Sequence, residues 1–176
     1  MGLQSEIGLI PRQPNAAQRA MQRTASAPAV AGFLAKALPP TDRLALRLTK
    51  GRVTIAGLLA ALPVVVLTTT GAKSGESRTS PLNGIPYRDD LAFIGTRFGS
   101  GKTPNWAYNL RAYPEAAIEY NGRTVAVTAR EADAAESDEV FDAGVRIYPG
   151  FAAYRERATN QIPVFILESA TPQVGQ

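Results

Sequence analysis

The sequence predicts a mainly β domain with several helices, in which five or six antiparallel strands form a small closed or split β-barrel. The pair Asn121-Gly122 lies between two runs rich in β-branched residues, which is the strongest short signal of a β-hairpin. A second hairpin pattern surrounds the polar residues 88–90. Strands do not alternate with crossover helices, so a doubly wound parallel sheet is disfavoured.

Within the barrel, the expected strands are bounded by turn residues and enriched in β-branched side chains. They span residues 64–70, 82–87, 91–96, 117–120, 123–130 and 162–168. Thr103 is expected to cap a short helix over residues 104–110. An acidic helix over 135–148 ends at Pro149-Gly150, and a shorter helix follows around Tyr154.

The chain divides into three regions by composition. Residues 1–50 are a basic, partly helical N-terminal segment, of which residues 1–28 are expected to be a loose or partly helical lead-in. Residues 29–48 have the apolar spacing of two amphipathic helical pieces, which either cover the core or lie on a membrane surface. Residues 51–170 are the barrel domain, and residues 171–176 are a flexible tail.

Cysteine and histidine are both absent from the 176 residues. Their absence excludes Ser-His-Asp and Cys-His machinery, disulfides and the usual zinc ligand sets, and we expect no metal. Tyr, Lys, Asp and Glu remain for acid–base work. A bound organic cofactor is therefore the natural carrier of any demanding chemistry.

The net charge of +4 is unevenly distributed along the chain. Residues 1–50 contain seven Lys/Arg against Glu6 and Asp42, whereas residues 131–142 contain six acidic residues and no basic one. The basic segment suits contact with an anionic membrane, and the acidic run suits a solvated helix face. Nucleic-acid binding is not expected, because no dense Lys/Arg stripe with interleaved aromatics is present.

No secretory signal is recognisable, and the apolar run over 55–67 is too short to cross a bilayer. We therefore expect a cytoplasmic protein. Peripheral contact with the inner face of the cell membrane is a further expectation, and it rests on the basic N-terminal segment.

The loop after the first expected strand carries Lys73, Ser74 and Arg78 around Gly71 and Gly75. Glycines permit positive φ angles that aim successive backbone N–H groups into one concavity, where the two cations add charge for a phosphate or carboxylate. The alternative is an ordinary hairpin with a solvated basic loop. The glycine spacing is not that of a P-loop.

Residues 99–103 have the appearance of the end of a P-loop, but they lack its first glycine. In addition, Pro104 removes an N–H group at the helix start, where a phosphate would bind. An ATP or GTP site is not expected there.

Several short motifs keep a constant spacing between residues 63 and 168. They are Leu67-Thr68-Thr69-Thr70-Gly71, Lys73-Ser74-Gly75, Arg78-Thr79, Pro81-Leu82, Pro104-x-Trp106-x-x-Asn109-Leu110, Tyr113-Pro114, Thr128-Ala129-Arg130, Tyr148-Pro149 and Ile162-Pro163-Val164. In combination they resemble the deazaflavin (coenzyme F420)-dependent nitroreductase family, within the FMN-binding split-barrel superfamily. The first fifty residues match only loosely.

The resemblance implies a split β-barrel that binds coenzyme F420, an 8-hydroxy-5-deazaflavin, and passes a hydride from its reduced form to a quinone or nitro compound. The residues implied to hold the phosphate and side chain of the coenzyme are Lys73, Ser74, Arg78, Thr79, Ser80, Pro81 and Leu82. Those implied to enclose its ring are Ile94, Gly95, Thr96, Arg97, Asn105, Trp106, Ala107, Tyr108, Asn109 and Phe151.

Tyr148 and Tyr154 are the candidates for orienting the electron acceptor, because a phenol can hydrogen-bond an oxygen on which charge develops. The alternative is that both are core aromatics. For Trp106 we favour a packed helix anchor over contact with the ring of the coenzyme. Arg130 is expected to close a cross-strand ion pair outside the site.

The chain departs from the family pattern at Ala72, where a second basic residue is usual, and at Asn83, where an aromatic one is usual. The loss of a cation at position 72 should weaken coenzyme binding modestly. The change at position 83 is on the expected acceptor side, so it puts the identity of the acceptor in doubt more than the chemistry. Two other functions remain open: an FMN-dependent oxidoreductase on the same barrel, with FMN the less favoured cofactor, and a deazaflavin-binding carrier with little turnover.

Overall fold

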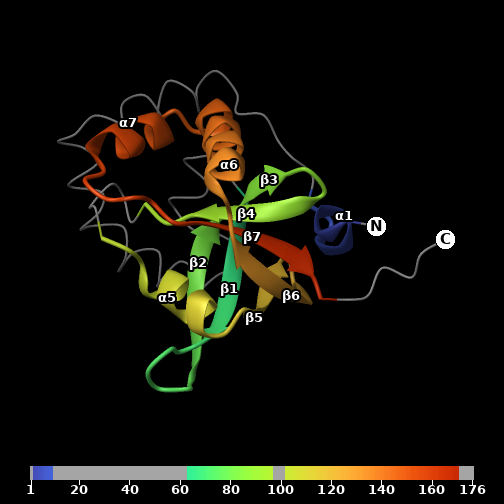
Figure 1. Cartoon of the computed structure of the whole chain (residues 1–176). Coiled ribbons are helices and arrows are strands. Elements are labelled where there is room, and N and C mark those ends of the chain that lie inside the picture. The colour runs from blue at the N-terminus through green and yellow to red at the C-terminus, as the bar shows by residue number, and fades with distance from the viewer. Residues whose placement is uncertain (1, 10–62, 97–101, 171–176) are drawn as a thin grey trace, which may run out of the picture.

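A computed structural model describes residues 2–9, 63–96 and 102–170 (Figure 1). Its seven strands form one antiparallel sheet in the order β2-β1-β5-β6-β7-β4-β3. The strands are β1 (Val64–Thr70), β2 (Ser77–Asn83), β3 (Ile85–Tyr87), β4 (Asp90–Ile94), β5 (Glu115–Tyr120), β6 (Arg123–Glu131) and β7 (Val164–Ser169). The helices are α1 (Leu3–Ile7), α5 (Asn105–Ala112), α6 (Ala134–Ile147) and α7 (Gly150–Arg157).

The prediction of a mainly β split barrel with helices is confirmed, but the predicted number of strands is wrong. The strand expected over 82–87 is divided at Gly84, and β2 already begins at Ser77, where the sequence indicated a loop. A Cβ on Gly84 would lie 3.0 Å from a methyl group of Leu91 and 3.2 Å from one of Val65, so a larger residue at this bend would press on the core. The two outermost strands of the sheet, β2 and β3, are thus halves of one bent strand, which curls the sheet into a split barrel.

Among the described strands β2 pairs only with β1, so it is an edge strand, and its residues are mostly polar and exposed. Pro81 lies opposite Val66 in this pairing. A proline has no N–H to donate, and an edge strand tolerates it. The same polarity is what made residues 77–81 look like loop in the sequence.

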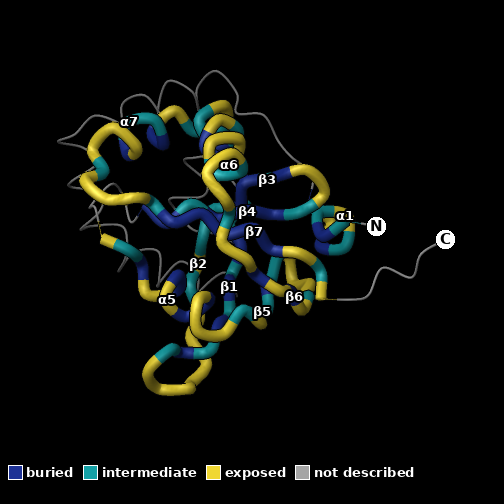
Figure 2. Tube along the Cα trace, viewed as in Figure 1, coloured by how far each residue is buried: buried dark blue, intermediate teal, exposed yellow. Residues whose placement is uncertain are grey.

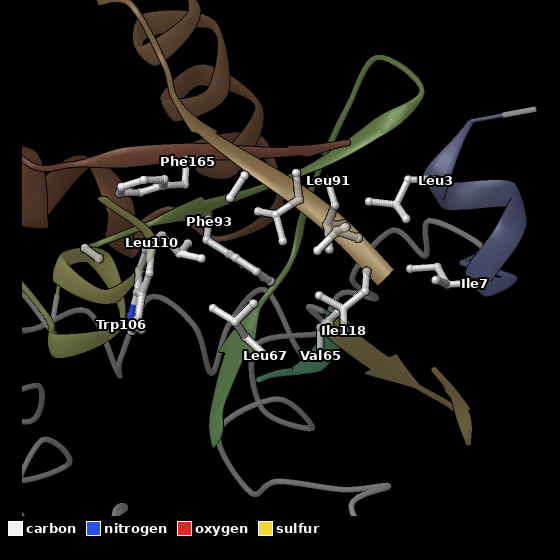
Figure 3. Close-up of a cluster of buried hydrophobic side chains, with 14 of the residues drawn as sticks. Leu3, Ile7, Val65, Leu67, Leu91, Phe93, Trp106, Leu110, Ile118 and Phe165 are labelled. Atoms are coloured by element: carbon white, nitrogen blue, oxygen red, sulfur yellow. The ribbon is translucent and has the colours of Figure 1, made fainter. Parts of the chain in front are cut away.

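Buried side chains form two clusters, and Figure 2 shows them along the inner strands and the inward faces of the helices. The larger cluster fills the barrel around Leu67, Phe93 and Phe165 (Figure 3). Trp106 from α5 packs edge-on against Phe93 and Phe165, with ring centroids 6.1 and 5.7 Å away. The smaller cluster lies beneath α6 and α7 and includes Phe141.

The N-terminal residues that the structure describes belong to the barrel core. Leu3 and Ile7 are buried in the larger cluster (Figure 3), and so is Leu9. The side-chain amide of Gln4 donates to the carbonyl of Asp90 at 2.7 Å. Of the two alternatives expected for residues 1–28, loose or partly helical, residues 3–7 show the helical one, and they are packed into the core. One helical turn with two apolar residues four positions apart is too short to recognise without its partner. Residues 10–62 lie outside the described part, and so do the expected amphipathic pieces.

Helix α5 starts one residue later than predicted and continues to Ala112. Pro104 is the N-cap, with φ −67° and ψ 153°, and no side chain caps the helix. Pro104 was expected to be the first helical residue, but its backbone is extended. The predicted cap Thr103 therefore lies outside the helix. The acidic helix is confirmed as α6, whose start is fixed by a capping box: the Glu136 N–H donates to Asp133 Oδ1 at 2.8 Å.

Candidate functional site

The turn between β1 and β2 extends away from the sheet at one end of the molecule (Figure 1). Two backbone hydrogen bonds of 2.8 Å close it, from the Gly71 N–H to the Glu76 carbonyl and from the Gly75 N–H to the Gly71 carbonyl. Gly75 has a φ of +68°, as expected. Gly71 does not have a positive φ, and that expectation is wrong; a Cβ there would lie 2.6 Å from Ser74 Oγ and 3.2 Å from the Glu76 carbonyl oxygen, so a side chain would force the turn to adjust.

The turn presents donors and positive charge to solvent. Within the described ranges, the backbone N–H groups of Lys73 and Ser74 and the ammonium of Lys73 have no hydrogen-bond or ion-pair partner. Arg78 lies in β2, where its Nη2 is 2.7 Å from Glu76 Oε2 and 3.4 Å from Ser74 Oγ. Both members of this ion pair are exposed, so the pair is weak and an anionic ligand can displace the glutamate.

Helix α5 is joined to this turn by Asn109, whose side chain is buried. Its Oδ1 accepts from the Ala72 N–H at 2.9 Å, and its Nδ2 donates to Thr69 Oγ1 at 3.0 Å. The opposite end of α5 lies beside a shallow depression. That depression is lined by Gly95, Thr96, Lys102, Thr103, Ala158, Asn160, Gln161, Ile162 and Pro163.

Three segments meet at the depression: the end of β4, the residues before α5 and the connection from α7 to β7. Gly95 lets them approach, because a Cβ there would stand 2.8 Å from Pro163 Cγ and 3.3 Å from Pro104 Cδ. The Gly95 N–H also donates to the Pro163 carbonyl at 2.8 Å. Sequence analysis assigned only Gly95 and Thr96 of this lining to the site.

Tyr148 and Tyr154 belong to one aromatic cluster at the junction of α6 and α7. Their hydroxyl oxygens are 3.4 Å apart, and both rings pack against Phe151. Tyr154 and Phe151 are buried, whereas Tyr148 is half-buried. Burial raises the pKa of the Tyr154 phenol, so this hydroxyl stays protonated at physiological pH.

A family model for the F420H(2)-dependent quinone reductases matches residues 43–169. This chain belongs to that family. Its members are oxidoreductases, so this chain is one as well. The expectation that it depends on coenzyme F420 is confirmed. An F420H(2)-dependent quinone reductase of Mycobacterium tuberculosis is 30% identical over 111 residues, which cover 60% of this chain and 72% of that protein.

Two solved structures are similar to this quinone reductase family member. An F420-H2 dependent reductase, FDR-A, is 34% identical with a TM-score of 0.56, and the match covers 60% of this chain and 94% of that one. A structure described as a domain-swapped dimer has the same identity and TM-score, with 60% and 80% covered. Both support the barrel described above.

The residues implied to bind F420 are brought together only in part. Lys73, Ser74, Arg78, Thr79 and Pro81 are exposed on the hairpin, while Ser80 and Leu82 are half-buried. Gly95 and Thr96 line the depression, and Ile94 packs beside Phe151 in the smaller cluster. Trp106 and Ala107 are buried in the barrel core, as favoured for Trp106, whereas Asn105 and Tyr108 are exposed. Arg97 lies outside the described residues.

The depression also involves residues that sequence analysis missed. Lys102 and Thr103 were considered as parts of a failed P-loop, and Thr103 also as a helix cap, but neither was assigned to the site. Ile162-Pro163 was noted as a motif at the start of an expected strand. Asn160 and Gln161 carry no signal in the sequence, because their proximity to Gly95 arises from the β4–β7 pairing.

The donor set fits the anionic part of F420, which carries a phosphodiester and carboxylates. The groups that bind such anions are present in the turn: backbone N–H groups at Lys73 and Ser74 and a Lys73 ammonium that have no partner among the described residues, and an arginine in a weak ion pair. No cluster of acidic residues that suits a metal ion occurs in the described ranges. In those same ranges, no helix has the length and apolar character needed to span a membrane.

Proposed function

We propose that this protein transfers a hydride from reduced coenzyme F420 to a quinone. The observation that supports this most directly is the arrangement along α5. The cationic turn contacts Asn109 in the second half of the helix, while the depression opens beside Lys102 and Thr103, ahead of its first turn. A ligand with an anionic tail and a flat ring needs two such sites held by one rigid element.

In this proposal the two sites bind different parts of the coenzyme. Lys73 and the backbone N–H groups of the turn bind the phosphate, and Arg78 exchanges Glu76 for an anionic group of the tail. The depression between Gly95 and the 158–163 segment encloses the ring, with Lys102 at its edge.

When bound, the reduced coenzyme supplies the hydride. The residues of this chain hold the acceptor close to it and exclude water. We assign the acceptor side to Tyr148, whose half-buried hydroxyl donates a hydrogen bond to the acceptor oxygen as charge develops there. The hydroxyl of Tyr154 keeps the Tyr148 phenol in position. In this proposal solvent supplies the proton after the hydride transfer, and the tyrosines orient the acceptor.

The test is a titration followed by turnover. Added F420 should show saturable fluorescence quenching with the purified protein, and F420H2 oxidation under anaerobic conditions should depend on added quinone. Parallel assays use a nitro compound as acceptor, which can accept the same hydrogen bond, and FMN as the competing cofactor. Tight FMN binding without F420 binding would overturn the proposal in favour of the FMN enzyme. F420 binding without turnover of either acceptor class would favour the carrier.

We also propose peripheral contact with an anionic membrane, which is where lipid-soluble quinones are found. The support is the excess of basic residues in 1–50. Replacing Arg12, Arg19 and Arg23 together by glutamine leaves the buried N-terminal leucines in place. This variant should co-sediment less than the parent with phosphatidylglycerol vesicles, and neither protein should bind phosphatidylcholine vesicles. Equal sedimentation on anionic vesicles would contradict membrane contact.

A further inference from the structure

Apart from aromatic residues, three polar side chains are buried in the part of the chain that the structure describes: Thr69, Thr96 and Asn109. Two of these, Thr69 and Asn109, are hydrogen-bonded to each other, with the Asn109 Nδ2 donating to Thr69 Oγ1 at 3.0 Å. A buried polar pair of this kind costs stability unless its groups find partners. It therefore requires a structural or functional reason.

The hydrogen bonds extend from α5 into both strands of the hairpin. Asn109 Oδ1 accepts from the Ala72 N–H at 2.9 Å, and the Thr69 hydroxyl donates to the Arg78 carbonyl at 3.4 Å. Ala72 directly precedes Lys73. One amide on α5 is thus linked to the backbone beside Lys73 and, through Thr69, to the backbone of Arg78.

We propose that Asn109 is a positioning residue that holds the β1–β2 turn in the shape that binds the anionic tail of F420. This inference rests on the proposed function and deepens it. The resemblance implied that Asn109 encloses the coenzyme ring, whereas both ends of its amide are already bonded within the protein and its side chain is buried. Asn109 acts through Lys73 and Arg78 rather than by contact with the ring.

Asparagine is suited to this role because its amide offers an acceptor and a donor about 2.3 Å apart on one planar group. The acceptor serves a turn N–H and the donor serves a hydroxyl on a strand, so the turn and β1 are held in one fixed relation to α5. An alanine at position 109 leaves the Ala72 N–H without its acceptor, and the turn is then free to adopt other conformations.

A purely structural role for Asn109 makes a different prediction from a positioning role. If Asn109 only satisfies buried groups, its loss lowers the melting temperature and leaves the coenzyme affinity of the folded protein unchanged. If it positions the turn, its loss weakens F420 binding and also removes most of the benefit of Lys73, because a displaced lysine contributes little. The coupling between the two residues separates these cases.

The experiment is a double-mutant cycle with Asn109→Ala and Lys73→Ala, measured by F420 fluorescence titration below the melting temperature of every variant. Each single variant should bind F420 about tenfold more weakly, as expected for one charge-assisted contact. The double variant should lose far less than the hundredfold that independent effects would give. The KM for F420H2 should rise, and the KM for quinone should stay at the parental value.

Thr69→Val removes the hydroxyl that accepts from the Asn109 amide and leaves the residues of α5 unchanged. It replaces Asn109→Ala in the experiment if that variant folds poorly. Thr69→Ser keeps the hydroxyl and should bind F420 like the parent. Hydrogen exchange at the Ala72 amide should accelerate in Asn109→Ala without any coenzyme present. Parental F420 affinity in Asn109→Ala and Thr69→Val, or additive losses in the cycle, would overturn the positioning role alone. Absence of F420 binding by the parent would overturn the proposed function, and this proposal with it.

Discussion

Gly150 lies directly beneath the ring of Tyr148: a Cβ on Gly150 would stand 2.2 Å from Tyr148 Cε1 and 2.7 Å from its hydroxyl oxygen. The first residue of α7 therefore determines where the phenol assigned to the acceptor can lie. The motif Tyr148-Pro149-Gly150 is a geometric unit in which the proline ends α6 and the glycine leaves room for the ring.

We expect Gly150→Ala to displace the Tyr148 ring and to lower the stability by about 1–3 kcal/mol, the usual cost of overpacking. Quinone turnover should fall and F420 affinity should stay at the parental value. In a Tyr148→Ala background the same glycine substitution should cost no stability, because no ring remains to be displaced. Thermal unfolding of the four proteins measures this, and an equal cost in both backgrounds would show that the ring is not the obstacle.

Tyr148→Phe keeps the ring and removes only the hydroxyl. If the hydroxyl stabilises charge on the acceptor oxygen, kcat/KM should fall by about 5-fold to 150-fold while F420 affinity barely changes. Tyr154→Phe should have a smaller effect of the same kind, because its buried hydroxyl reaches only Tyr148. Steady-state kinetics with several quinones and a nitro compound provide the comparison. Parental rates for both variants with every acceptor would identify the two tyrosines as packing residues.

Substitutions in the β1–β2 turn should change F420 affinity in both directions. Lys73→Ala and Arg78→Ala should each weaken binding by about tenfold, and added salt should weaken binding to the parent. Glu76→Gln should strengthen binding, because it frees Arg78 from its ion pair and removes a negative charge. Arg123→Ala, an exposed cation on the β5–β6 hairpin, is the matched control. Equal affinities for all five proteins would exclude the turn from the binding site.

The buried N-terminal residues should contribute strongly to stability. Leu3→Ala or Ile7→Ala removes a fully buried side chain and should cost about 2–5 kcal/mol. Ser5→Ala, at an exposed position of the same helix, should have little effect on stability. Denaturant unfolding gives the values. Parental stability in both core variants would mean that α1 does not close the barrel.

Acid should destabilise the protein through Glu136. Hydrogen bonds from Arg130, at 2.7 Å to each carboxylate oxygen, lower the pKa of Glu136 from 4.5 to about 2. A carboxylate with a lowered pKa stabilises the folded state above pH 4.5, and this contribution is lost as the pH falls toward 2. In Glu136→Gln the melting temperature should therefore depend less on pH over this interval. Identical pH profiles for the variant and the parent would contradict the assignment.

The sequence predicted the hairpins well because their signals are local. Asn121 and Gly122 both have positive φ, 50° and 78°, as the turn type that favours this pair requires. The start of β2 was missed because an edge strand with one partner has no apolar alternation to reveal it. The position of α1 was missed because its apolar residues pack against strands that lie far along the chain, and the local sequence does not reveal those partners.

The candidate site could be predicted from the sequence only in part: the cationic turn was visible, and most of the depression was not. Lys73 and Arg78 could be singled out because glycines and cations mark the turn in the sequence itself, and their role in binding stays a prediction. The 158–163 side of the depression was not found, since no residue type there is distinctive and the proximity depends on sheet pairing. The hydrogen bonds of Asn109 to Ala72 and Thr69 could not be predicted from the sequence either, because an asparagine in a helix can face a ligand or a neighbouring turn.

The contacts of α1 with β4, β6 and β7 also bear on how the protein is made. During synthesis Leu3 and Ile7 leave the ribosome well before β7, at residues 164–169. The side chains of this leucine and isoleucine therefore lack part of their packing partners until β7 has emerged. Folding of the barrel cannot proceed simply from the N-terminus, and the exposed apolar turn is a natural binding site for a chaperone during that interval.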